Sequence, residues 1–272
     1  MQISECWIYP IKSCSGIKVD SLTLHNKLVE NDRNWMMIDR QGRFITQREC
    51  IQLAKIQPEI TDDKLNIHIG KEVFSVPLRK TFKENDEREV TIWGDTPWAY
   101  DEGIDVAQWL SEKLAINCRL VRLHDKKRRL VDQSYADPRD FVGFADGFPL
   151  LVVNQRSLDA LSNKSGVEID VRRFRPNIVI TDNELEAFAE RKWGDLAESN
   201  GHYTLSCVKP CERCVIPTRD PDSLERTIEV ISAMRELCTI DNRIIFGQNA
   251  VISGYSASTL KIHVGDRLVT NP

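Results

Sequence analysis

Short apolar segments separated by turn signals dominate the first half of the chain. They cover residues 3–8, 35–38, 44–47, 65–69, 72–76 and 90–93, with Asp-Asp, Gly-Lys and Gly-Asp pairs between the later ones. Such short strands at close spacing are typical of an antiparallel barrel or sandwich. Apolar residues at helical spacing interrupt them once, at 104–114, and predict a packing helix there. The pattern strongly limits this half to a β-rich fold.

The second half alternates strands with helices. Strand patterns cover residues 118–123, 148–153, 178–181, 244–252 and 260–269. Helical spacing covers 155–162, where Asn154 is a plausible N-cap, and a segment from Asp222 or Ser223 to 237. We therefore predict an α+β fold that is predominantly β. The polar stretch that holds Lys126, Lys127, Arg128 and Arg129 reads as a solvated loop, and we place the boundary between two domains, 1–122 and 123–272, beside it.

Composition excludes several classes of protein. The 272 residues are 41% hydrophobic and 29% charged, as is ordinary for a globular protein, and the net charge of -4 disfavours a general binder of nucleic acid or membrane surfaces. No apolar run approaches the roughly 20 residues of a membrane span. The start of the chain lacks the pattern of a signal peptide. We expect a cytoplasmic protein without nucleic-acid or membrane partners.

Three of the eight cysteines lie close together, at Cys207, Cys211 and Cys214. Pro210 and Pro217 disfavour a helix or a regular central strand here, so the pattern predicts a stiff loop that carries soft sulfur ligands. Arg213, beside Cys214, would favour the thiolate, which is the form that binds metal or attacks an electrophile.

Several sites would fit these cysteines. Their spacing matches that of an iron-sulfur cluster in radical enzymes, although only 58 residues (272 minus 214) remain after Cys214 for the barrel that follows such motifs. A zinc site would need a fourth ligand, such as Cys238. A redox Cys-x-x-Cys pair should open a helix, but Pro217 follows too soon. Each alternative leaves Lys12, Arg33 and Arg175 without a role.

One family accounts for the cysteines and the basic residues together. The motifs are Tyr9-Pro10-Ile11-Lys12-Ser13-Cys14, Asp32-Arg33-Asn34-Trp35, Phe174-Arg175-Pro176-Asn177, Cys211-Glu212-Arg213-Cys214 followed by Asp220-Pro221-Asp222, and Phe246-Gly247-Gln248-Asn249. In this order they strongly resemble the MOSC family, the molybdenum cofactor sulfurase C-terminal domain proteins, and most of all the branch with an N-terminal β-barrel domain. That branch includes the mitochondrial amidoxime-reducing component and bacterial relatives. The resemblance implies an N-terminal β-barrel followed by a MOSC β-barrel with flanking helices.

The resemblance also implies a molybdenum cofactor, molybdopterin, and the residues that hold it. Cys214 matches the thiolate ligand of molybdenum, whereas Cys211 matches a position without a catalytic part. Lys12, Ser13, Arg33 and Arg175 match a grip on the phosphate of the pterin, which suits their charged and hydroxyl donors. The remaining matches are Asn177, Glu212 and Arg213 at the pterin edges, Asp146, Gly147 and Phe148 at the metal site, with Asp146 as a proton shuttle, and Asn249 near the cofactor. Lone arginines and Asp-Gly pairs are also common in surface ion pairs and turns.

The implied activity is the reduction of N-hydroxylated compounds, such as hydroxylamines, amidoximes or N-hydroxylated bases. The implied electron donor is a separate flavin, haem or iron-sulfur protein, because the chain has no ferredoxin-like domain after residue 272. Ser223 and Leu224 replace the Thr-Gly that often ends the family's Asp-Pro-Asp motif, which affects a loop contact and not the metal ligand. At family level alone, pyridoxal phosphate binding is a further implication. The alternative function is a carrier of the cofactor or of persulfide sulfur, without reductase activity.

Overall fold

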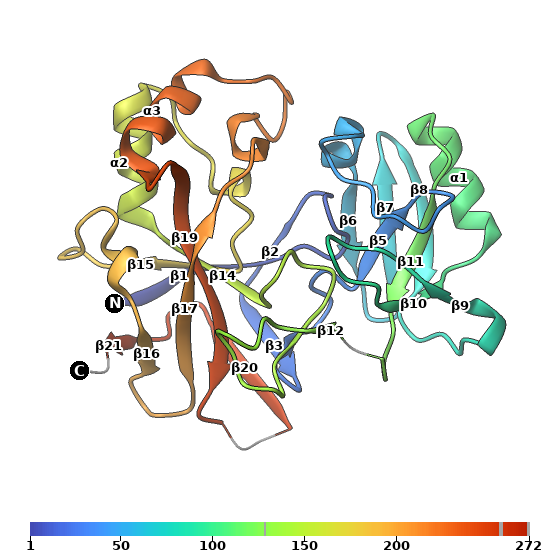
Figure 1. The fold of residues 1–272 in the computed structure, drawn as a ribbon, viewed down its shortest axis with the longest axis horizontal. Helices are drawn as coiled ribbons and strands as arrows, with labels where there is room; N and C mark the ends of the chain where they lie inside the picture. The colour runs from blue at the N-terminus through green and yellow to red at the C-terminus, as the bar shows by residue number, and fades with distance from the viewer. Residues whose placement is uncertain (128, 256–257, 271–272) are drawn as a thin grey trace.

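The computed structural model describes residues 1–127, 129–255 and 258–270, so Arg128 of the basic run and Pro272 lie outside the described residues. Two lobes lie side by side (Figure 1). One lobe contains the long strands β17 (Thr204–Glu212) and β19 (Arg243–Ser253) with the helices α2 (Gln155–Ser165) and α3 (Ile228–Cys238). The other contains short strands and the helix α1 (Ile104–Leu114). The predicted α+β class with a predominance of strands is confirmed.

A nine-stranded sheet forms the first lobe. Its order is β2-β1-β15-β14-β19-β17-β16-β21, and β18 pairs with β19 outside this path. The remaining members of this sheet are β1 (Gln2–Ile8), β2 (Ile17–Val19), β14 (Leu150–Asn154), β15 (Ile178–Thr181), β16 (Asp195–Glu198), β18 (Thr239–Ile240) and β21 (Leu268–Thr270).

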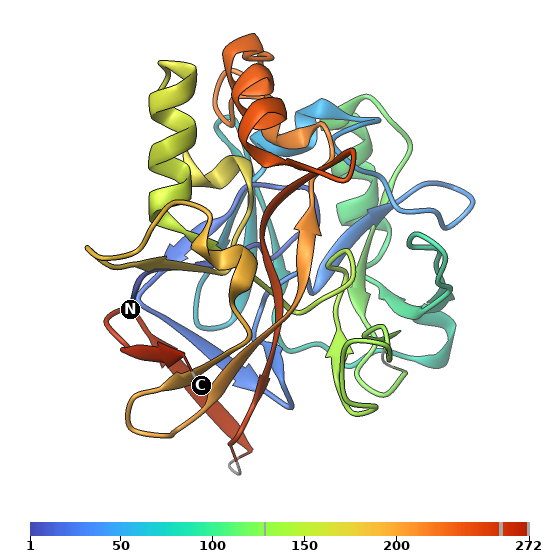
Figure 2. The ribbon, with the colours of Figure 1, turned by 60° about the vertical axis from the view of Figure 1, so that its left-hand side comes forward.

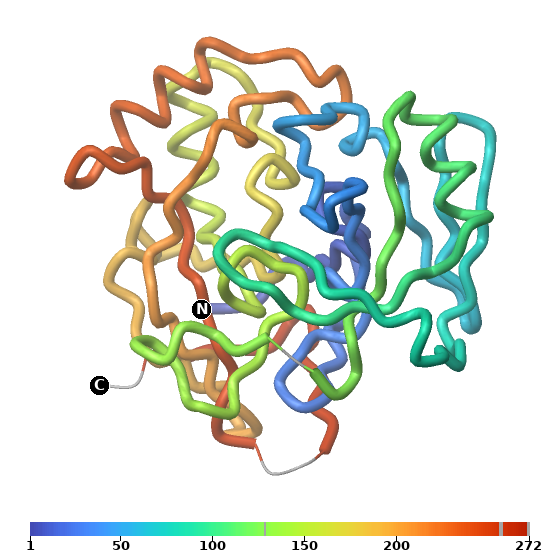
Figure 3. Tube along the Cα trace, turned by 45° about the vertical axis from the view of Figure 1, so that its right-hand side comes forward, coloured from blue at the N-terminus to red at the C-terminus, as the bar shows by residue number. Residues whose placement is uncertain are grey.

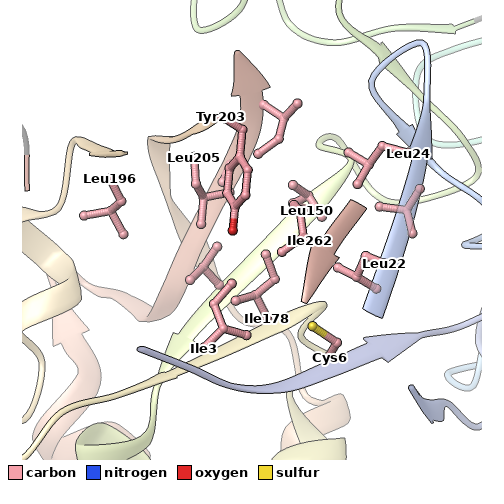
Figure 4. Packing of buried hydrophobic residues seen from close by; sticks show 14 of the residues in the cluster. Ile3, Cys6, Leu22, Leu24, Leu150, Ile178, Leu196, Tyr203, Leu205 and Ile262 are labelled. Carbon is pink, nitrogen blue, oxygen red and sulfur yellow. The ribbon is translucent and has the colours of Figure 1, made fainter. Parts of the chain in front are cut away.

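The sheet closes on itself into a barrel. The Ile3 amide donates to the Asp266 carbonyl at 3.0 Å, and the Leu268 amide donates to the Met1 carbonyl at 2.9 Å, so β1 joins the segment that leads into β21. Closure removes most of the free sheet edge on which other chains could pair, although β17 is open on one side after its pairing with β16 ends at Ser206. Alternate residues of the strands point inward and form one apolar core that includes Ile3, Cys6, Leu150 and Tyr203 (Figure 4).

A small sheet covers one side of this barrel. It has the order β20-β3-β4, with bounds β3 (Ser21–His25), β4 (Leu28–Val29) and β20 (Thr259–His263). Leu22, Leu24 and Ile262 add to the barrel core. The first 29 residues therefore pair with strands from the second half of the sequence. A division at residue 122 would assign β1 and its partner β15 to different domains. The boundary between the two domains therefore stays a prediction.

The second lobe packs two antiparallel sheets and α1 around a separate core. One sheet has the order β5-β11-β10-β9 and the other β6-β7-β8. Their bounds are β5 (Trp35–Ile38), β6 (Gln57–Ile60), β7 (Lys64–Ile69), β8 (Glu72–Pro77), β9 (Glu87–Glu89), β10 (Trp98–Asp101) and β11 (Arg119–Leu123). The pair β12 (Arg129–Leu130) and β13 (Phe141–Val142) follows on the way back to the barrel.

The helices α2 and α3 stand side by side at one end of the barrel (Figure 2). Asn154 caps α2 as predicted, since its side chain accepts the Arg156 amide. Short 3-10 turns connect other elements: η1 (Ile51–Lys55), η2 (Glu84–Asp86), η3 (Val171–Arg173), η4 (Ala189–Lys192) and η5 (Ile216–Thr218). Of these turns, η3 leads into the segment Phe174–Asn177 and η5 follows Cys214.

Three predicted elements differ from the structure. Residues 44–47 and 90–93 make only isolated bridges, such as Arg43 with Thr91, and no full strand. The helix expected from residue 222 begins at Ile228, because the Asp220 carboxylate accepts the amides of Asp222 and Ser223 and holds the preceding residues in a loop. The first two differ for one reason: these segments have strand-like sequences, but only single residues in or beside them pair with a neighbouring segment.

Two bulges distort the pairing of β17 with β19. Between Cys207 and Lys209 one extra residue of β17 is inserted, and between Pro210 and Glu212 the extra residue lies in β19. Gly247 sits in this second bulge with φ +79, and a Cβ there would lie 2.9 Å from the Val152 carbonyl oxygen. β16 pairs β17 only from Thr204 to Ser206, so Pro210 lies on an open edge. The expected loop is thus a strand as far as Glu212.

Candidate functional site

Lys12 lies buried where the two lobes meet. Its ammonium group donates to the Phe144 carbonyl at 2.9 Å and to Asp146 Oδ1 at 2.5 Å. The Tyr9-Pro10 and Ser15-Gly16 turn signals around Lys12 and Ser13 predict a tight, exposed loop, and the predicted exposure is wrong: the two residues are only 6% and 8% exposed. The tight turn itself is present, since the Cys14 amide donates to the Ile11 carbonyl.

The Lys12–Asp146 pair has unequal surroundings. Burial lowers the pKa of Lys12, and the nearby guanidinium groups of Arg129 and Arg33 lower it further, while Asp146 opposes this shift. Desolvation raises the pKa of Asp146, but the charge of Lys12 and hydrogen bonds from Lys12 and Trp93 outweigh it and hold that pKa well below its usual range. The Asp146 side chain is 76% exposed. It is therefore an ionised, accessible carboxylate at the edge of a buried positive charge.

Arg33 connects three segments. Its Nη1 donates to both carboxylate oxygens of Asp32, at 2.7 and 2.6 Å, and to Asn177 Oδ1 at 3.0 Å. Its Nη2 donates to the Arg175 carbonyl at 2.9 Å. Asn177 also accepts the Leu151 amide and donates to the Trp7 carbonyl. Asn177 thus reaches the site through Arg33, and its own polar atoms are already engaged.

Tyr9 holds two guanidinium groups against its ring. The Cζ atoms of Arg33 and Arg175 lie 4.4 and 4.3 Å from the ring centroid. Burial and the charge of Arg33 lower the pKa of Arg175 to about 10. Arg175 donates to the Cys14 carbonyl, and the described residues place no carboxylate within ion-pair distance of it. The cluster therefore holds a positive charge that lacks a counter-ion within the described part of the chain.

Four of the twelve non-glycine residues with positive φ in the described part of the chain lie in this region. Ser13, Arg33, Trp93 and Arg175 adopt φ angles of +68, +48, +54 and +58. Such left-handed conformations are uncommon for residues other than glycine, asparagine and aspartate, and they gather at functional sites where surrounding contacts hold them. Here the hydrogen bonds of Arg33 and the ring of Tyr9 supply those contacts. The strained backbone indicates that surrounding contacts fix these side chains in place.

The cysteine loop leaves β17 beside this cluster. Arg213 donates to the Phe174 carbonyl at 2.7 Å and to Cys211 Sγ at 3.1 Å, so its guanidinium lies on Cys211 although it precedes Cys214 in sequence. Cys214 is exposed, and no hydrogen bond to it is found within the described segments. We expected the Arg213 guanidinium to activate Cys214, but it contacts Cys211 instead.

Two arginines fix the continuation of this loop. Arg172 makes a two-pronged ion pair with Asp222, at 3.0 and 2.8 Å, and Arg173 pairs with Asp220 at 2.9 Å. Burial lowers the pKa of Arg173, and Asp220 opposes the shift. The Asp-Pro-Asp motif thus anchors the loop to η3, directly before the Phe174–Asn177 segment. The altered residues Ser223 and Leu224 lie in this anchored loop, where Leu224 takes φ +64.

The three cysteines do not converge. Cys207 packs against the barrel core, whereas Cys211 packs against the cluster under α2 and α3. The bulge between Cys207 and Lys209 causes this, because one inserted residue reverses which face of a strand a side chain occupies. Burial raises the pKa of Cys207 to about 12, so its thiol stays protonated. No group of three or more His, Cys, Asp or Glu side chains arranged to hold a metal occurs among residues 1–127, 129–255 and 258–270.

Other predicted residues lie at varying distances from the cluster. Gly147 follows Asp146 with open space around its Cα, and Phe148 packs in a small core beside β19. Glu212 is exposed at the end of β17. Asn249 is half-buried on β19, opposite Leu151 and Lys209, and the described residues show no hydrogen bond from its side chain to the cluster.

Sequence reasoning missed two contributors. Arg129, which the sequence placed in a solvated basic run, has a side chain that is only 8% exposed, and it donates to the carbonyls of Ala145 and Asp146, both at 2.7 Å. Trp93 donates from Nε1 to Asp146 Oδ1 at 3.3 Å. Figure 3 shows the chain around Trp93 reaching from its own lobe toward the segment that holds Asp146. The only signal was a bulky residue in a turn sequence, Trp93-Gly94-Asp95.

Two family models match the chain in the order that the motifs predicted. The MOSC N-terminal beta barrel domain matches residues 1–117, and the MOSC domain matches residues 140–269. The chain belongs to the MOSC family. It is similar to mitochondrial amidoxime reducing component 2 of Bos taurus, with 28% identity over 93% of this chain and 77% of that protein. Mitochondrial amidoxime-reducing component 1 of Mus musculus is 29% identical over 97% and 80% of the two chains.

A second kind of relative matches over part of its length. Molybdenum cofactor sulfurase of Drosophila grimshawi is 31% identical over 78% of this chain, which corresponds to 27% of the sulfurase. Both kinds of relative therefore share the MOSC architecture with this chain. No helix in the described segments is long and apolar enough to cross a bilayer.

The residues of this MOSC protein fit a phosphorylated pterin with a soft metal. Among the described residues, Arg175 lacks a carboxylate partner, and the buried Tyr9 hydroxyl and Arg213 Nε have no hydrogen-bond partner. Cationic and hydroxyl donors of this kind suit a phosphate. A free, exposed thiol on Cys214 suits a soft metal. The donor set thus agrees with the cofactor that the names of the relatives indicate.

Proposed function

We propose that this MOSC protein is a molybdenum-cofactor-dependent oxidoreductase that reduces N-hydroxylated compounds. The observation that carries the proposal is a cationic cluster built by Lys12, Arg33 and Arg175 from two distant parts of the chain, next to the loop of Cys214. Amidoxime-reducing relatives that align over nearly all of this chain support the choice of substrate class.

The residues would divide the work between them. Lys12, Ser13, Arg33 and Arg175 would bind the phosphate, and Cys214 would bind the metal. Gly147 and Phe148 would line the metal site with Asp146. Asn177, Glu212 and Arg213 would border the pterin, with Asn249 near the cofactor. When bound, the cofactor supplies two-electron redox chemistry. The net reaction converts N–OH to N–H with two electrons and two protons and releases water. A separate donor protein supplies the electrons.

Asp146 is the group placed to move a proton. Its carboxylate is exposed on one side and bonded to Lys12 Nζ on the other. Because the charge of Lys12 and the hydrogen bonds from Lys12 and Trp93 hold the pKa of Asp146 low, the carboxylate is ionised, and it would relay protons between solvent and the site and not store one. Proton supply to the leaving oxygen as water is the role that this position suits.

The test is elemental analysis and turnover of protein from a host that makes the pterin cofactor. We expect near-stoichiometric molybdenum and reduction of an amidoxime with a chemical electron donor. Cys214→Ser should lose turnover, whereas Cys211→Ser should retain it because Cys211 is half-buried beneath Arg213. A fully active Cys214→Ser variant with bound metal would contradict the proposal, as would stoichiometric iron or zinc without molybdenum.

The sulfurase relatives favour one other candidate, a carrier of the cofactor or of persulfide sulfur. The exposed Cys214 would serve a persulfide equally well. A carrier would bind cofactor but show no substrate-dependent oxidation of the reduced, loaded protein. An oxidoreductase would be oxidised by one equivalent of an N-hydroxylated substrate.

A further inference from the structure

Trp93 occupies a position that turn geometry reserves for small residues. Ile92 and Asp95 exchange both backbone hydrogen bonds, each at 3.0 Å, so Trp93 and Gly94 form a two-residue turn. Trp93 is the first of the pair and has φ +54. Glycine, asparagine and aspartate are favoured at such a position, and a bulky residue there is strained. Strain of this kind points to a role for the side chain that is held there.

The indole ring lies at the rim of the cationic cluster. It is 43% exposed, and its Nε1 donates to the same Asp146 oxygen that Lys12 binds. Lys12 Nζ lies 5.9 Å from the ring centroid. The Phe44 ring supports the indole from 5.0 Å away at a tilt of 56°. An exposed aromatic surface therefore stands beside the carboxylate proposed to move a proton.

A planar group already lies over this ring. The Arg48 guanidinium carbon lies 4.8 Å from the ring centroid. Arg48 is exposed, and its side chain makes only a 3.4 Å contact to the Thr46 hydroxyl among the described residues. A guanidinium has the same flat N–C–N arrangement as an amidoxime. The ring thus accepts a delocalised planar group, and Arg48 holds that place loosely.

We infer that Trp93 is the specificity-determining residue for the N-hydroxylated substrate. It stacks planar, delocalised substrates, namely amidoximes and N-hydroxylated bases, at the edge of the site, and Arg48 moves aside or covers them. Small tetrahedral hydroxylamines have no planar, delocalised group that could stack on the ring. This inference rests on the proposed reductase function and names the substrate class within it.

The experiment compares benzamidoxime with N-methylhydroxylamine on the molybdenum-loaded protein, using a chemical electron donor. Trp93→Gly should raise KM for benzamidoxime about tenfold, the usual effect of removing one aromatic stack, and leave KM for N-methylhydroxylamine unchanged. Because the variant also loses the Nε1 hydrogen bond to Asp146, kcat should change for both substrates alike. Its thermal midpoint should stay the same or rise, because glycine relieves the strained φ. Trp93→Phe should keep most of the discrimination, since the ring remains.

Trp98→Ala is the matched control. Trp98 belongs to the same lobe and also carries a cation on its ring, Lys127 at 3.8 Å, but it contacts neither Lys12 nor Asp146 among the described residues. Trp98→Ala should leave the ratio of the KM values for benzamidoxime and N-methylhydroxylamine unchanged. An unchanged ratio in Trp93→Gly would overturn this inference and leave the reductase proposal standing. A wild-type protein that reduces neither substrate would overturn both.

Discussion

Tyr9 organises the cationic cluster at the scale of single residues. Its ring contacts the guanidinium groups of Arg33 and Arg175, and its backbone amide donates to Asp32 Oδ1 at 2.8 Å. A glycine at position 16 makes room for this ring, because a Cβ there would lie 2.4 Å from Tyr9 Cε1. The spacing between Tyr9 and Gly16 in the sequence motif therefore has a packing reason.

Replacing Gly16 by alanine should disturb the cluster. The Tyr9 ring must shift, which moves both guanidinium groups. We expect the free energy of unfolding to fall by about 1–3 kcal/mol, as for an overpacked core, and the bound molybdenum to fall with it. Chemical denaturation and elemental analysis measure the two effects. Gly194→Ala is the control, since a Cβ at Gly194 meets nothing within 4 Å. Wild-type metal content and stability in Gly16→Ala would show that the ring does not position the arginines.

At the scale of elements, the sequence predicted those segments whose pattern is local. The helix at 104–114 is confirmed at both ends, because its apolar spacing and the left-handed Ala115 after it need no distant partner. The site residues from the family motifs came together at Lys12, Arg33 and Arg175. Trp93 and Arg129 could not be predicted, since their contacts with the Asp146 segment arise only when the two lobes meet. The bulge that separates Cys207 from Cys211 is likewise a property of the strand pair.

Glu190 links η4 to α2 and should make stability depend on pH. Its carboxylate accepts from Ser157 at 2.7 Å and Asn154 at 3.1 Å, but Oε1 finds no hydrogen-bond partner in the described segments. Burial raises the pKa of Glu190 in the folded state above its value of 4.5 when unfolded. Such a group stabilises the fold below the unfolded pKa, and this contribution is lost as pH rises through the folded pKa. The free energy of unfolding of Glu190→Gln should therefore exceed that of the wild type by about 1 kcal/mol at pH 7 and equal it near pH 4.

Glu198 provides a control of the opposite sign. Its burial alone would raise the pKa, but backbone hydrogen bonds from Asn200 and His202 outweigh this and lower it. Glu198→Gln should hence destabilise the protein at neutral pH. Urea denaturation of both variants at pH 4 and pH 7 measures the two changes. A Glu190→Gln variant that is less stable than wild type at pH 7 would refute the assignment of Glu190 as an unsatisfied charge.

At the scale of the whole molecule, the first strand closes the barrel that the second half of the chain builds. β1 pairs with β15 on one side and with the segment before β21 on the other, and β3 pairs with β20. The lobe of β5–β11 is thus inserted between two parts of one barrel. This arrangement brings Lys12 and Arg33, which follow the first strands, next to Arg175 and the cysteine loop.

A fragment of residues 123–272 alone should therefore fail to fold. It would lose Ile3, Cys6, Ile8, Leu22, Leu24 and Val29 from the barrel core. At about 1.5–3 kcal/mol for each buried aliphatic side chain, this loss rivals the roughly 5–15 kcal/mol that stabilise a whole domain. A permuted chain, in which residues 1–30 follow residue 270 through a short linker, should recover cooperative thermal unfolding. Met1 and Leu268 exchange backbone hydrogen bonds at 2.9 and 3.2 Å, so the new connection is short. Circular dichroism of the two chains separates the outcomes: cooperative unfolding of the fragment alone would mean that the barrel does not need its first strand, and the division at residue 122 would then mark an independent domain.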